Sequence, residues 1–161
     1  MISCVGAVLM LSSCMAQSDT TNVSKKKDES MKKYNDLSPQ QENVLVNKAT
    51  DRPFTGDYYL KTDKGIYICR RCNNPLYYSD DKFESHCGWP SFDQEIKGAV
   101  KRVPDADGQR IEIICNNCGG HLGHVFEGEG FTDKDVRHCV NTSSLKFVPQ
   151  SEIKNLPPVI K

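Results

Sequence analysis

The sequence predicts a mainly β fold, a small antiparallel β-sheet domain with a short N-terminal helix and a four-cysteine zinc site. Short apolar segments bounded by turn residues follow one another between residues 65 and 148, which is the pattern of strands joined by tight turns. A helix start signal at Ser38 precedes them. Two Cys-x-x-Cys pairs, at residues 69–72 and 115–118, have the form of a zinc cage.

The helix signal comes directly before the first predicted strand region. Ser38 suits the N-cap, Pro39 suits the first helical position, and Gln41 completes the spacing of a capping box. Because the residue before a proline disfavours helical backbone, Pro53 ends any helix by about Arg52.

The remaining elements are predicted as strands. Two of them flank the first cysteine pair as a knuckle. Asp-Gly in residues 105–108 is typical of a hairpin turn. In the strand that follows, Ile111, Ile113 and Cys115 alternate with Glu112, as a strand with one well-buried face requires. The predicted strands cover residues 65–69, 75–78, 99–103, 109–115, 121–126, 136–140 and 145–148.

The N-terminal residues have a different composition. Residues 2–11 are largely apolar, far fewer than the ~20 residues of a membrane span, and Leu-Ser-Ser follows before Cys14. Residues 1–14 resemble a bacterial lipoprotein signal peptide with its lipobox, cut before Cys14, which is then lipidated. No Lys or Arg precedes the apolar run, so an ordinary secretory signal or a wrongly assigned start codon stays open. We expect an exported protein of the bacterial cell envelope, periplasmic or membrane-anchored.

The rest of the chain is interpreted as one domain with two flanking segments. Residues 15–36 are almost all polar, which predicts a flexible linker. Residues 37–150 are long enough for one domain with a core, and residues 151–161 form a C-terminal tail. Lys+Arg and Asp+Glu total 21 each, so bulk charge does not argue for a nucleic-acid partner. We expect a monomer.

The two cysteine pairs supply four thiolates, enough to complete a tetrahedron around one Zn²⁺. The 42 residues between the pairs exceed the roughly 15–20 of a compact zinc ribbon. The metal is therefore expected to staple a larger domain, held by Cys69, Cys72, Cys115 and Cys118. Two disulfides are the alternative.

Cys139 is a candidate nucleophile. Arg137 and Asn141 stand two residues to either side of it and share its face of the predicted strand, because strand side chains repeat every second position. A nearby guanidinium favours the thiolate, which is the nucleophilic form. The alternative is a buried, inert cysteine.

Cys87 lies in a predicted loop with Trp89, the only tryptophan of the chain. A loop cysteine can move to meet another thiol, as a resolving cysteine must, while Trp89 could simply belong to the core. His121 and His124 follow the second cysteine pair. Because four thiolates already fill the zinc site, these histidines suit hydrogen bonding or proton donation better than metal binding; isolated surface histidines are the alternative.

With these segments in view, the chain resembles the B-type methionine sulfoxide reductases over residues 37–148. Each motif is modest by itself, but their joint order and spacing is specific. The motifs are Pro53-Phe54-Thr55-Gly56, both Cys-x-x-Cys pairs, Cys87-Gly88-Trp89-Pro90-Ser91-Phe92, Arg110-Ile111-Glu112, His121-Leu122-Gly123-His124-Val125-Phe126 and Arg137-His138-Cys139-Val140-Asn141.

The resemblance implies a peptide-methionine (R)-S-oxide reductase. Cys139 would attack the sulfoxide sulfur, and Arg137 would help to hold it as thiolate. His121, His124 and Asn141 would orient and protonate the sulfoxide oxygen, directly or through water. The substrate would be methionine-R-sulfoxide in oxidised proteins, with the free amino acid as a further candidate.

The resemblance also implies how the enzyme is recycled. Trp89 would face the methyl group of the substrate. Cys139 would become a sulfenic acid, and Cys87 would condense with it to a disulfide, which a thioredoxin-like reductant would open by thiol exchange. The Zn²⁺ would be structural, one per chain.

The chain departs from the family pattern at two histidines and, conservatively, at Thr142-Ser143-Ser144, which replaces a Ser-Ala-Ser type segment. His138 stands where an aromatic Tyr or Phe is usual, but neighbouring strand residues face opposite ways, so His138 should point away from Cys139. His86 replaces the usual Gly before Cys87, which would make that loop less free to move.

A zinc-ribbon binding module is the alternative function. It explains the four metal cysteines but gives no role to Cys87, Cys139 or the two histidines, and it predicts a basic, aromatic surface that the balanced charge does not supply. A zinc hydrolase is excluded, because a catalytic zinc keeps an open coordination position and four cysteines close the site.

Overall fold

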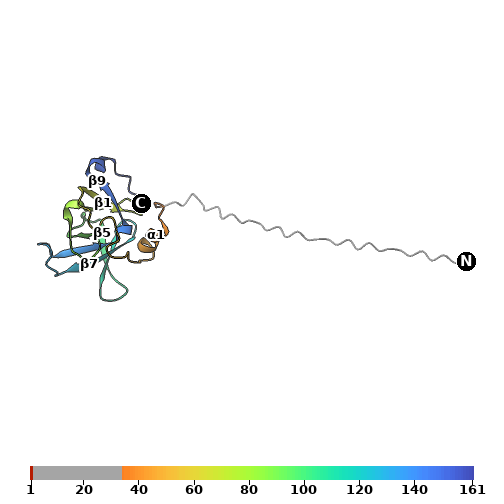
Figure 1. The fold of residues 1–161 in the computed structure, drawn as a ribbon, viewed down its shortest axis with the longest axis horizontal. Helices are drawn as coiled ribbons and strands as arrows, with labels where there is room; N and C mark the ends of the chain where they lie inside the picture. The colour runs from red at the N-terminus through yellow and green to blue at the C-terminus, as the bar shows by residue number, and fades with distance from the viewer. Residues whose placement is uncertain (2–33) are drawn as a thin grey trace. The chain divides into compact units, whose positions relative to one another are not determined.

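The structure, a computed structural model, describes Met1 and residues 34–161 (Figure 1). Residues 2–14 of the expected signal peptide, with Cys14, and the expected linker up to residue 33 lie outside the described residues. No helix formed by residues 34–161 combines the length and the apolar character that crossing a bilayer requires.

The described residues form two antiparallel sheets and one short α-helix, which confirms the predicted fold class. One sheet has the strand order β2-β1-β9 and the other has the order β3-β4-β8-β7-β6-β5. The elements are α1 (Pro39–Leu45), β1 (Gly65–Cys69), β2 (Pro75–Tyr78), η2 (Ser79–Asp81), β3 (Lys82–Phe83), β4 (Ser91–Phe92), β5 (Val100–Pro104), β6 (Ile111–Cys115), β7 (His121–Glu127), β8 (Val136–Val140), η3 (Thr142–Ser144), β9 (Leu145–Pro149) and η4 (Gln150–Asn155).

Helix α1 begins as predicted. The backbone N–H of Gln41 donates to Ser38 Oγ at 3.3 Å and the Gln41 side chain accepts from the Ser38 N–H at 3.0 Å, which completes the capping box. The helix ends at Leu45, before the limit that Pro53 sets, and Lys48 then adopts a positive φ of 61°. The buried face of α1 packs against η3 and β7.

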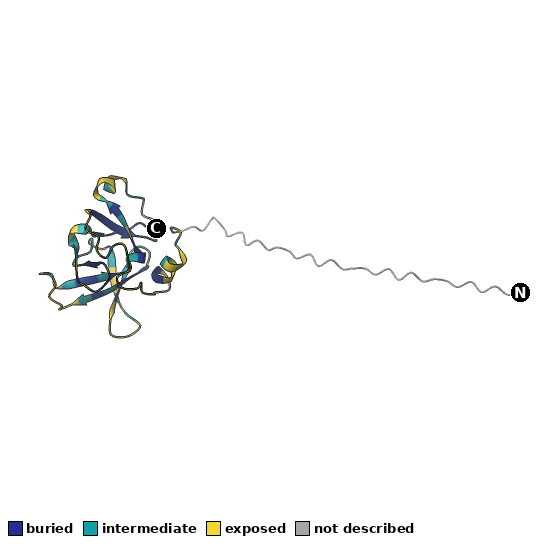
Figure 2. Cartoon of the chain, in the orientation of Figure 1, coloured by how far each residue is buried: buried dark blue, intermediate teal, exposed yellow. Residues whose placement is uncertain are grey.

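The core lies between the two sheets, where Figure 2 shows strands of both sheets coloured as buried. The Tyr77 ring stacks on Phe92, with 4.3 Å between centroids, and Tyr67 meets Phe92 edge-on at 5.0 Å. Aromatic pairs of this kind contribute about 0.5–1.5 kcal/mol beyond the area they bury. His138 is fully buried on this side, with Nδ1 3.1 Å from the Tyr77 hydroxyl, so it faces away from Cys139 as expected.

Strands β3 and β4 were not predicted. Each has two residues, too few to show any period. They form because Ser91 pairs with Cys139 and Phe92 with His138 of β8, which places the loop that carries Cys87 beside the centre of the larger sheet.

The last residues of the chain return to the cysteine pairs. The Ile160 N–H donates to Cys72 O at 2.9 Å, and Asn117 Nδ2 donates to Ile160 O at 2.7 Å. Asn73 Nδ2 donates to Pro158 O at 3.0 Å. The segment expected as a C-terminal tail therefore bridges the two knuckles through its backbone.

Candidate active site

The face of the larger sheet that points away from the core carries a row of reactive side chains. Pairing across the strands places Glu112 opposite His124, His124 opposite Cys139, and Cys139 opposite Ser91. Directly opposite residues of an antiparallel pair have side chains on the same face. The sheet register thus brings together residues from β4, β6, β7 and β8.

Cys87 and Cys139 meet at one end of this row. Their Sγ atoms lie 3.7 Å apart, and none of the six cysteines in the described part of the chain forms a disulfide. Both side chains are partly exposed. The two sulfurs are therefore in contact as thiols, within a small movement of the roughly 2.05 Å of a disulfide bond.

The contact between the two thiols changes the pKa of both. The hydrogen bond from the Cys139 thiol, with further hydrogen bonds from the Ser85 and Ser91 hydroxyls, lowers the pKa of Cys87 to about 4. The same contact and burial raise the pKa of Cys139, and Arg137 opposes that rise. While the thiols touch, the first negative charge therefore forms on Cys87, whereas Arg137 favours it on Cys139.

Arg137 is held firmly beside Cys139. Its guanidinium donates to both carboxylate oxygens of Glu129, at 2.7 and 2.9 Å, and lies 4.4 Å from the centre of the Phe126 ring. A bidentate pair of this kind fixes the plane of the guanidinium. The hydrogen bonds to Glu129 also raise the pKa of Arg137, so its positive charge is permanent.

A small pocket of about 110 Å³ opens at Cys139. Its lining combines one thiol, one histidine, two aromatic rings and several polar side chains. The lining residues are Thr50, Trp89, Arg110, Gly123, His124, Phe126, Cys139 and Asn141. The pocket therefore offers an apolar wall and hydrogen-bonding groups around one sulfur nucleophile.

His121 and His124 lie on the same side of the sheet, with ring centroids 5.6 Å apart. Residues three apart in a regular strand would face opposite ways. A bulge in β7 allows this arrangement: Ile113 pairs with Gly123 and Ile114 with His121, so Leu122 is the extra residue. Gly123 allows close approach, because a Cβ there would lie 2.0 Å from Cys139 O.

The two histidines have different surroundings. His124 Nε2–H donates to Asp105 Oδ2 at 2.5 Å, and His124 lines the pocket. His121 lies deeper and donates Nδ1–H to Glu112 Oε1 at 2.7 Å, while its buried Nε2 has no protein partner. Burial lowers the pKa of His121, although Glu112 opposes this, so His121 is neutral at neutral pH.

Glu112 is buried and holds both the histidine and a lysine. Lys48 Nζ donates to Glu112 Oε2 at 2.8 Å. Burial opposes ionisation, but the hydrogen bonds from Lys48 and His121 outweigh it, and the pKa of Glu112 is lowered. An ionised Glu112 fixes the tautomer of His121 with its proton on Nδ1.

Asn141 borders the pocket, but its amide is largely committed to the backbone. Its Oδ1 accepts from the Asp51 N–H at 2.9 Å and its Nδ2 donates to Leu122 O at 3.1 Å. One amide hydrogen of Asn141 remains for a ligand. Trp89 is also fixed, since its Nε1–H donates to Asp51 O at 3.0 Å.

His86 and Gly88 flank Cys87 with left-handed backbone, at φ of 57° and 92°. A Cβ on Gly88 would lie 2.7 Å from Pro53 Cβ. Glycine adopts a positive φ without strain, but His86 carries a Cβ. A residue with a side chain pays about 1–2 kcal/mol for this backbone conformation. The Cys87 loop is therefore held in a strained conformation at the residue where the sequence departs from glycine.

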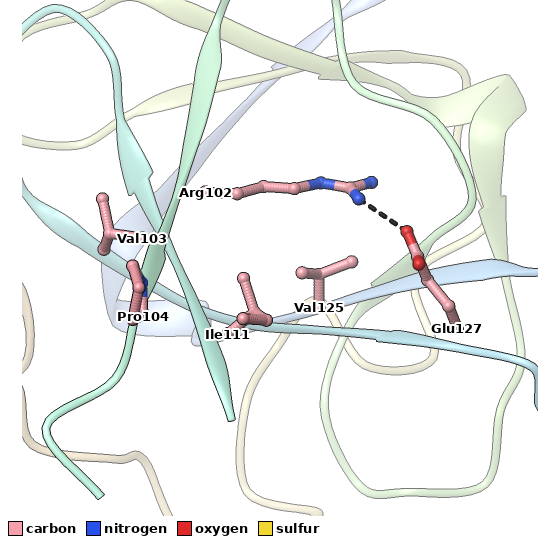
Figure 3. Close-up of a pocket in the computed structure, with 6 residues that line it drawn as sticks. All are labelled: Arg102, Val103, Pro104, Ile111, Val125 and Glu127. Carbon is pink, nitrogen blue, oxygen red and sulfur yellow. Dashed lines mark hydrogen bonds and ion pairs between the residues drawn. The ribbon is translucent and has the colours of Figure 1, made fainter. Parts of the chain in front are cut away.

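A larger hollow of about 360 Å³ is lined by residues of β5, β6 and β7 (Figure 3). Arg102 donates to Glu127 at 2.6 Å above Ile111 and Val125 (Figure 3). Its lining contains no thiol and no histidine. Reactive groups, and not size, therefore identify the smaller pocket as the candidate active site.

The four remaining described cysteines form a separate cluster. Their Sγ atoms all lie within 4.8 Å of one another, with 3.7 Å between Cys69 and Cys118 and 3.6 Å between Cys72 and Cys115. A tetrahedron with Zn–S bonds of ~2.3 Å has edges of about 3.8 Å. The donor set and its spacing therefore fit Zn²⁺, with four sulfurs closing the coordination sphere.

The sequence interpretation missed several residues of the site. Thr50, Asp51 and Asp105 carry no motif, and each reaches the site through a contact between residues distant in the sequence. Glu112 and Arg110 belong to a motif that was noted without a role. The signal that could have identified Glu112 is its acidic side chain in a strand that is otherwise apolar.

Residues 37–149 match the SelR domain family. The chain is 57% identical over 116 residues to peptide methionine sulfoxide reductase B2, chloroplastic, of Arabidopsis thaliana, covering 71% of this chain and 57% of that protein. It is 55% identical over 121 residues to reductase B3, chloroplastic, of Oryza sativa subsp. japonica, covering 74% of this chain and 53% of that protein. The chain thus spans little more than half the length of these two relatives. It is also 49% identical over 138 residues to reductase B5 of the same rice, covering 85% of this chain and all of that protein.

Proposed function

We propose, from the premise that this chain belongs to the SelR domain family of B-type methionine sulfoxide reductases, that it reduces methionine-R-sulfoxide to methionine. The substrate is oxidised protein, with the free amino acid as a further candidate. One observation carries the proposal: Cys139 opens into a pocket while its Sγ lies 3.7 Å from that of Cys87. One sulfur can react with a ligand, and the second can resolve the product.

The first step is attack by Cys139 on the sulfoxide sulfur. The low pKa of Cys87, about 4, makes it a thiolate that can accept the Cys139 proton across their contact. Arg137 stabilises the resulting Cys139 thiolate. The methionine sulfur gains two electrons, the Cys139 sulfur loses two, and the oxygen leaves with one proton as part of a Cys139 sulfenic acid.

The sulfoxide oxygen needs a proton and hydrogen bonds while this happens. We assign the proton to His124 in its imidazolium form, because it lines the pocket and Asp105 orients its ring: Asp105 accepts from Nε2–H, so Nδ1–H is the proton that is transferred. His121 acts from behind it through water, with Glu112 fixing its tautomer. The remaining amide hydrogen of Asn141 can donate to the oxygen, and the Trp89 ring offers the apolar wall for the methyl group.

The second step closes the disulfide. Cys87, now carrying the proton, attacks Cys139 Sγ; the S–S bond forms, the S–O bond breaks, and water leaves with the oxygen. A thioredoxin-like dithiol then reduces the disulfide by thiol exchange and takes up the oxidation itself. We propose that the protein acts as a monomer and that it has no nucleic-acid partner.

A structural zinc completes the proposal. Cys69, Cys72, Cys115 and Cys118 would hold one Zn²⁺, which adds folding free energy and takes no part in the reaction. The separation of these four thiols from the two in the pocket supports that division of roles. We further propose residues 37–150 as the catalytic domain, and export through residues 1–14 with lipidation at Cys14.

Single-turnover reduction of resolved R- and S-methionine sulfoxide by the reduced, zinc-loaded full chain tests this function. We expect consumption of the R epimer alone and loss of two thiols per turnover. Reduction of neither epimer with zinc fully bound would contradict the proposal and favour a zinc-ribbon binding module.

A further inference from the structure

We propose that Asp51 is a positioning residue for the substrate pocket. Its backbone holds Trp89 and Asn141, and its buried carboxylate anchors that backbone to the turn after β8. The inference rests on the proposed function, since the pocket that Asp51 would shape is the proposed substrate site. Asp51 touches neither thiol among the contacts of the described residues, so it acts through its neighbours.

The backbone of Asp51 joins two walls of the pocket. Its N–H donates to Asn141 Oδ1 at 2.9 Å, and its carbonyl oxygen accepts from Trp89 Nε1–H at 3.0 Å. The preceding residue, Thr50, lines the pocket itself. One short segment therefore sets the position of an aromatic ring, an amide and a hydroxyl around Cys139.

No sheet pairing holds this segment, because residues 49–52 belong to no helix or strand. The Asp51 carboxylate supplies the missing anchor. It accepts from the Ser143 N–H and from Ser143 Oγ, each at 2.7 Å, and from Gln40 Nε2 at 3.2 Å. Asp51 is only 7% exposed, so these charge-assisted hydrogen bonds are shielded from water.

The anchor and the walls form a closed loop of contacts. Ser143 lies in η3, two residues after Asn141, so the carboxylate binds the turn that directly follows a pocket residue. Without the carboxylate, Asp51 and the indole it holds can drift from Asn141. A misplacement of about 1 Å can cost up to about a hundredfold in rate. Because the displaced groups are walls of the substrate pocket, we expect most of this loss to come from weaker substrate binding.

The test compares Asp51→Ala with Asp51→Asn in the zinc-loaded full chain. Trp89 is the only tryptophan, so intrinsic fluorescence reports on this one ring. We expect Asp51→Ala to shift the Trp89 emission and to lower kcat/KM for methionine-R-sulfoxide roughly tenfold to a hundredfold, mainly through KM. Asp51→Asn can still accept from the Ser143 N–H, so it restores much of both signals.

The matched control is Val148→Ala, which removes a buried side chain from β9 in the smaller sheet. It lowers the melting temperature as Asp51→Ala does, but leaves the Trp89 emission and KM unchanged. The alkylation rate of Cys139 should be the same in all variants. These comparisons separate a loss of stability from a displaced pocket wall.

Unchanged Trp89 emission with unchanged KM in Asp51→Ala would overturn the inference while leaving the reductase function intact. If the unmodified protein reduces no sulfoxide, the proposed function fails. In that case the emission of the three variants still decides whether Asp51 positions Trp89.

Discussion

Cys87 Sγ and Cys139 Sγ lie 3.7 Å apart although the residues are 52 positions apart in the chain. The pairing of Ser91 with Cys139 holds the Cys87 loop against β8. The two thiols are thus positioned by backbone hydrogen bonds, and their contact is the basis of the proton exchange and the disulfide that we propose.

Removal of Cys139 and removal of Cys87 should affect sulfoxide reduction in different ways. Cys139→Ser is expected to abolish sulfoxide reduction, because serine is not oxidised to a sulfenic acid equivalent. Cys87→Ser should complete one turnover and then stall when thioredoxin is the only reductant. Product counted per enzyme, with and without a small added thiol, distinguishes the two. Repeated thioredoxin-driven turnover by Cys87→Ser would remove Cys87 from the resolving role.

Thiol reactivity should follow the contact between the sulfurs. The hydrogen bond from Cys139 lowers the pKa of Cys87 to about 4, so Cys87 is a thiolate at any pH above that value. We expect Cys87 to be alkylated at slightly acidic pH, where ordinary thiols are unreactive. In Cys139→Ala the donor is lost, and the alkylation profile should move to higher pH. Identical profiles in the two proteins would contradict a proton shared between the sulfurs.

Glu112→Gln should weaken both activity and acid stability. The glutamine keeps the shape but loses the charge that holds Lys48 and His121, at a cost of roughly 1–3 kcal/mol in the free energy of unfolding. The folded pKa of Glu112 is lowered from the ordinary 4.5. Its stabilisation is therefore complete above pH 4.5 and is lost as the pH falls through the folded pKa.

Melting temperatures across acidic pH, with Lys48→Ala as the comparison, measure this contribution. Lys48→Ala removes one partner of Glu112 but leaves its hydrogen bond to His121, so kcat should fall less than in Glu112→Gln. Equal losses of kcat in both variants would show that the orientation of His121 is unimportant.

His138 should make the protein sensitive to acid. Burial lowers its pKa from 6.5 to about 4, so the unfolded chain binds the proton first as the pH falls. The corresponding loss of stability is roughly 3 kcal/mol between pH 6.5 and pH 4. His138→Phe removes this titration and also the buried Nε2 that lacks a hydrogen bond.

The difference in melting temperature between His138→Phe and the unmodified protein should therefore grow as the pH falls from 6.5 to 4. At neutral pH the free energies of unfolding of the two proteins should differ by less than about 1.5 kcal/mol, since the ring is replaced by one of similar size. A difference that does not change with pH would contradict this account. Activity should be unaffected, because His138 faces the core.

Removal of one metal ligand should unfold the domain. Structural zinc contributes about 10–16 kcal/mol of apparent binding free energy in small peptides, comparable to the whole stability of a typical domain, ~5–15 kcal/mol. We expect Cys72→Ser to lose zinc and its cooperative thermal transition. Cys87→Ser, the matched cysteine control, should keep both. An unchanged melting temperature in Cys72→Ser without bound metal would contradict a structural role for zinc.

Some parts of this structure follow from short stretches of sequence. The capping box at Ser38 and the knuckles around the metal cysteines depend on residues within four positions of one another, and the structure has them where the spacing predicts. Alternation in residues 111–115 predicted the burial of Ile113 and Cys115, but it was wrong for Ile111, which is exposed, and for Glu112, which is buried. In each case the relevant geometry is that of a single turn or strand.

Other parts depend on contacts between residues distant in the sequence. Simple alternation would place His121 and His124 on opposite faces, but the bulge in β7, opposite Ile113 and Ile114, and the glycine at 123 bring them together. Strand β4 exists only because β8 pairs with it. Nothing local in Thr50 or Asp51 indicates a pocket wall.

The sequence by itself therefore determined the fold class, the grouping of four cysteines into one cluster and the family. Only the tertiary structure decided that the Cys87 and Cys139 thiols lie in contact, that Glu112 and Asp105 bind the two histidines, and that the Asp51 backbone binds Trp89 and Asn141. The reason is physical: residue type and spacing specify local turns and strand faces, whereas pKa values and pocket walls depend on burial and on partners that only the register of paired strands brings within hydrogen-bonding distance.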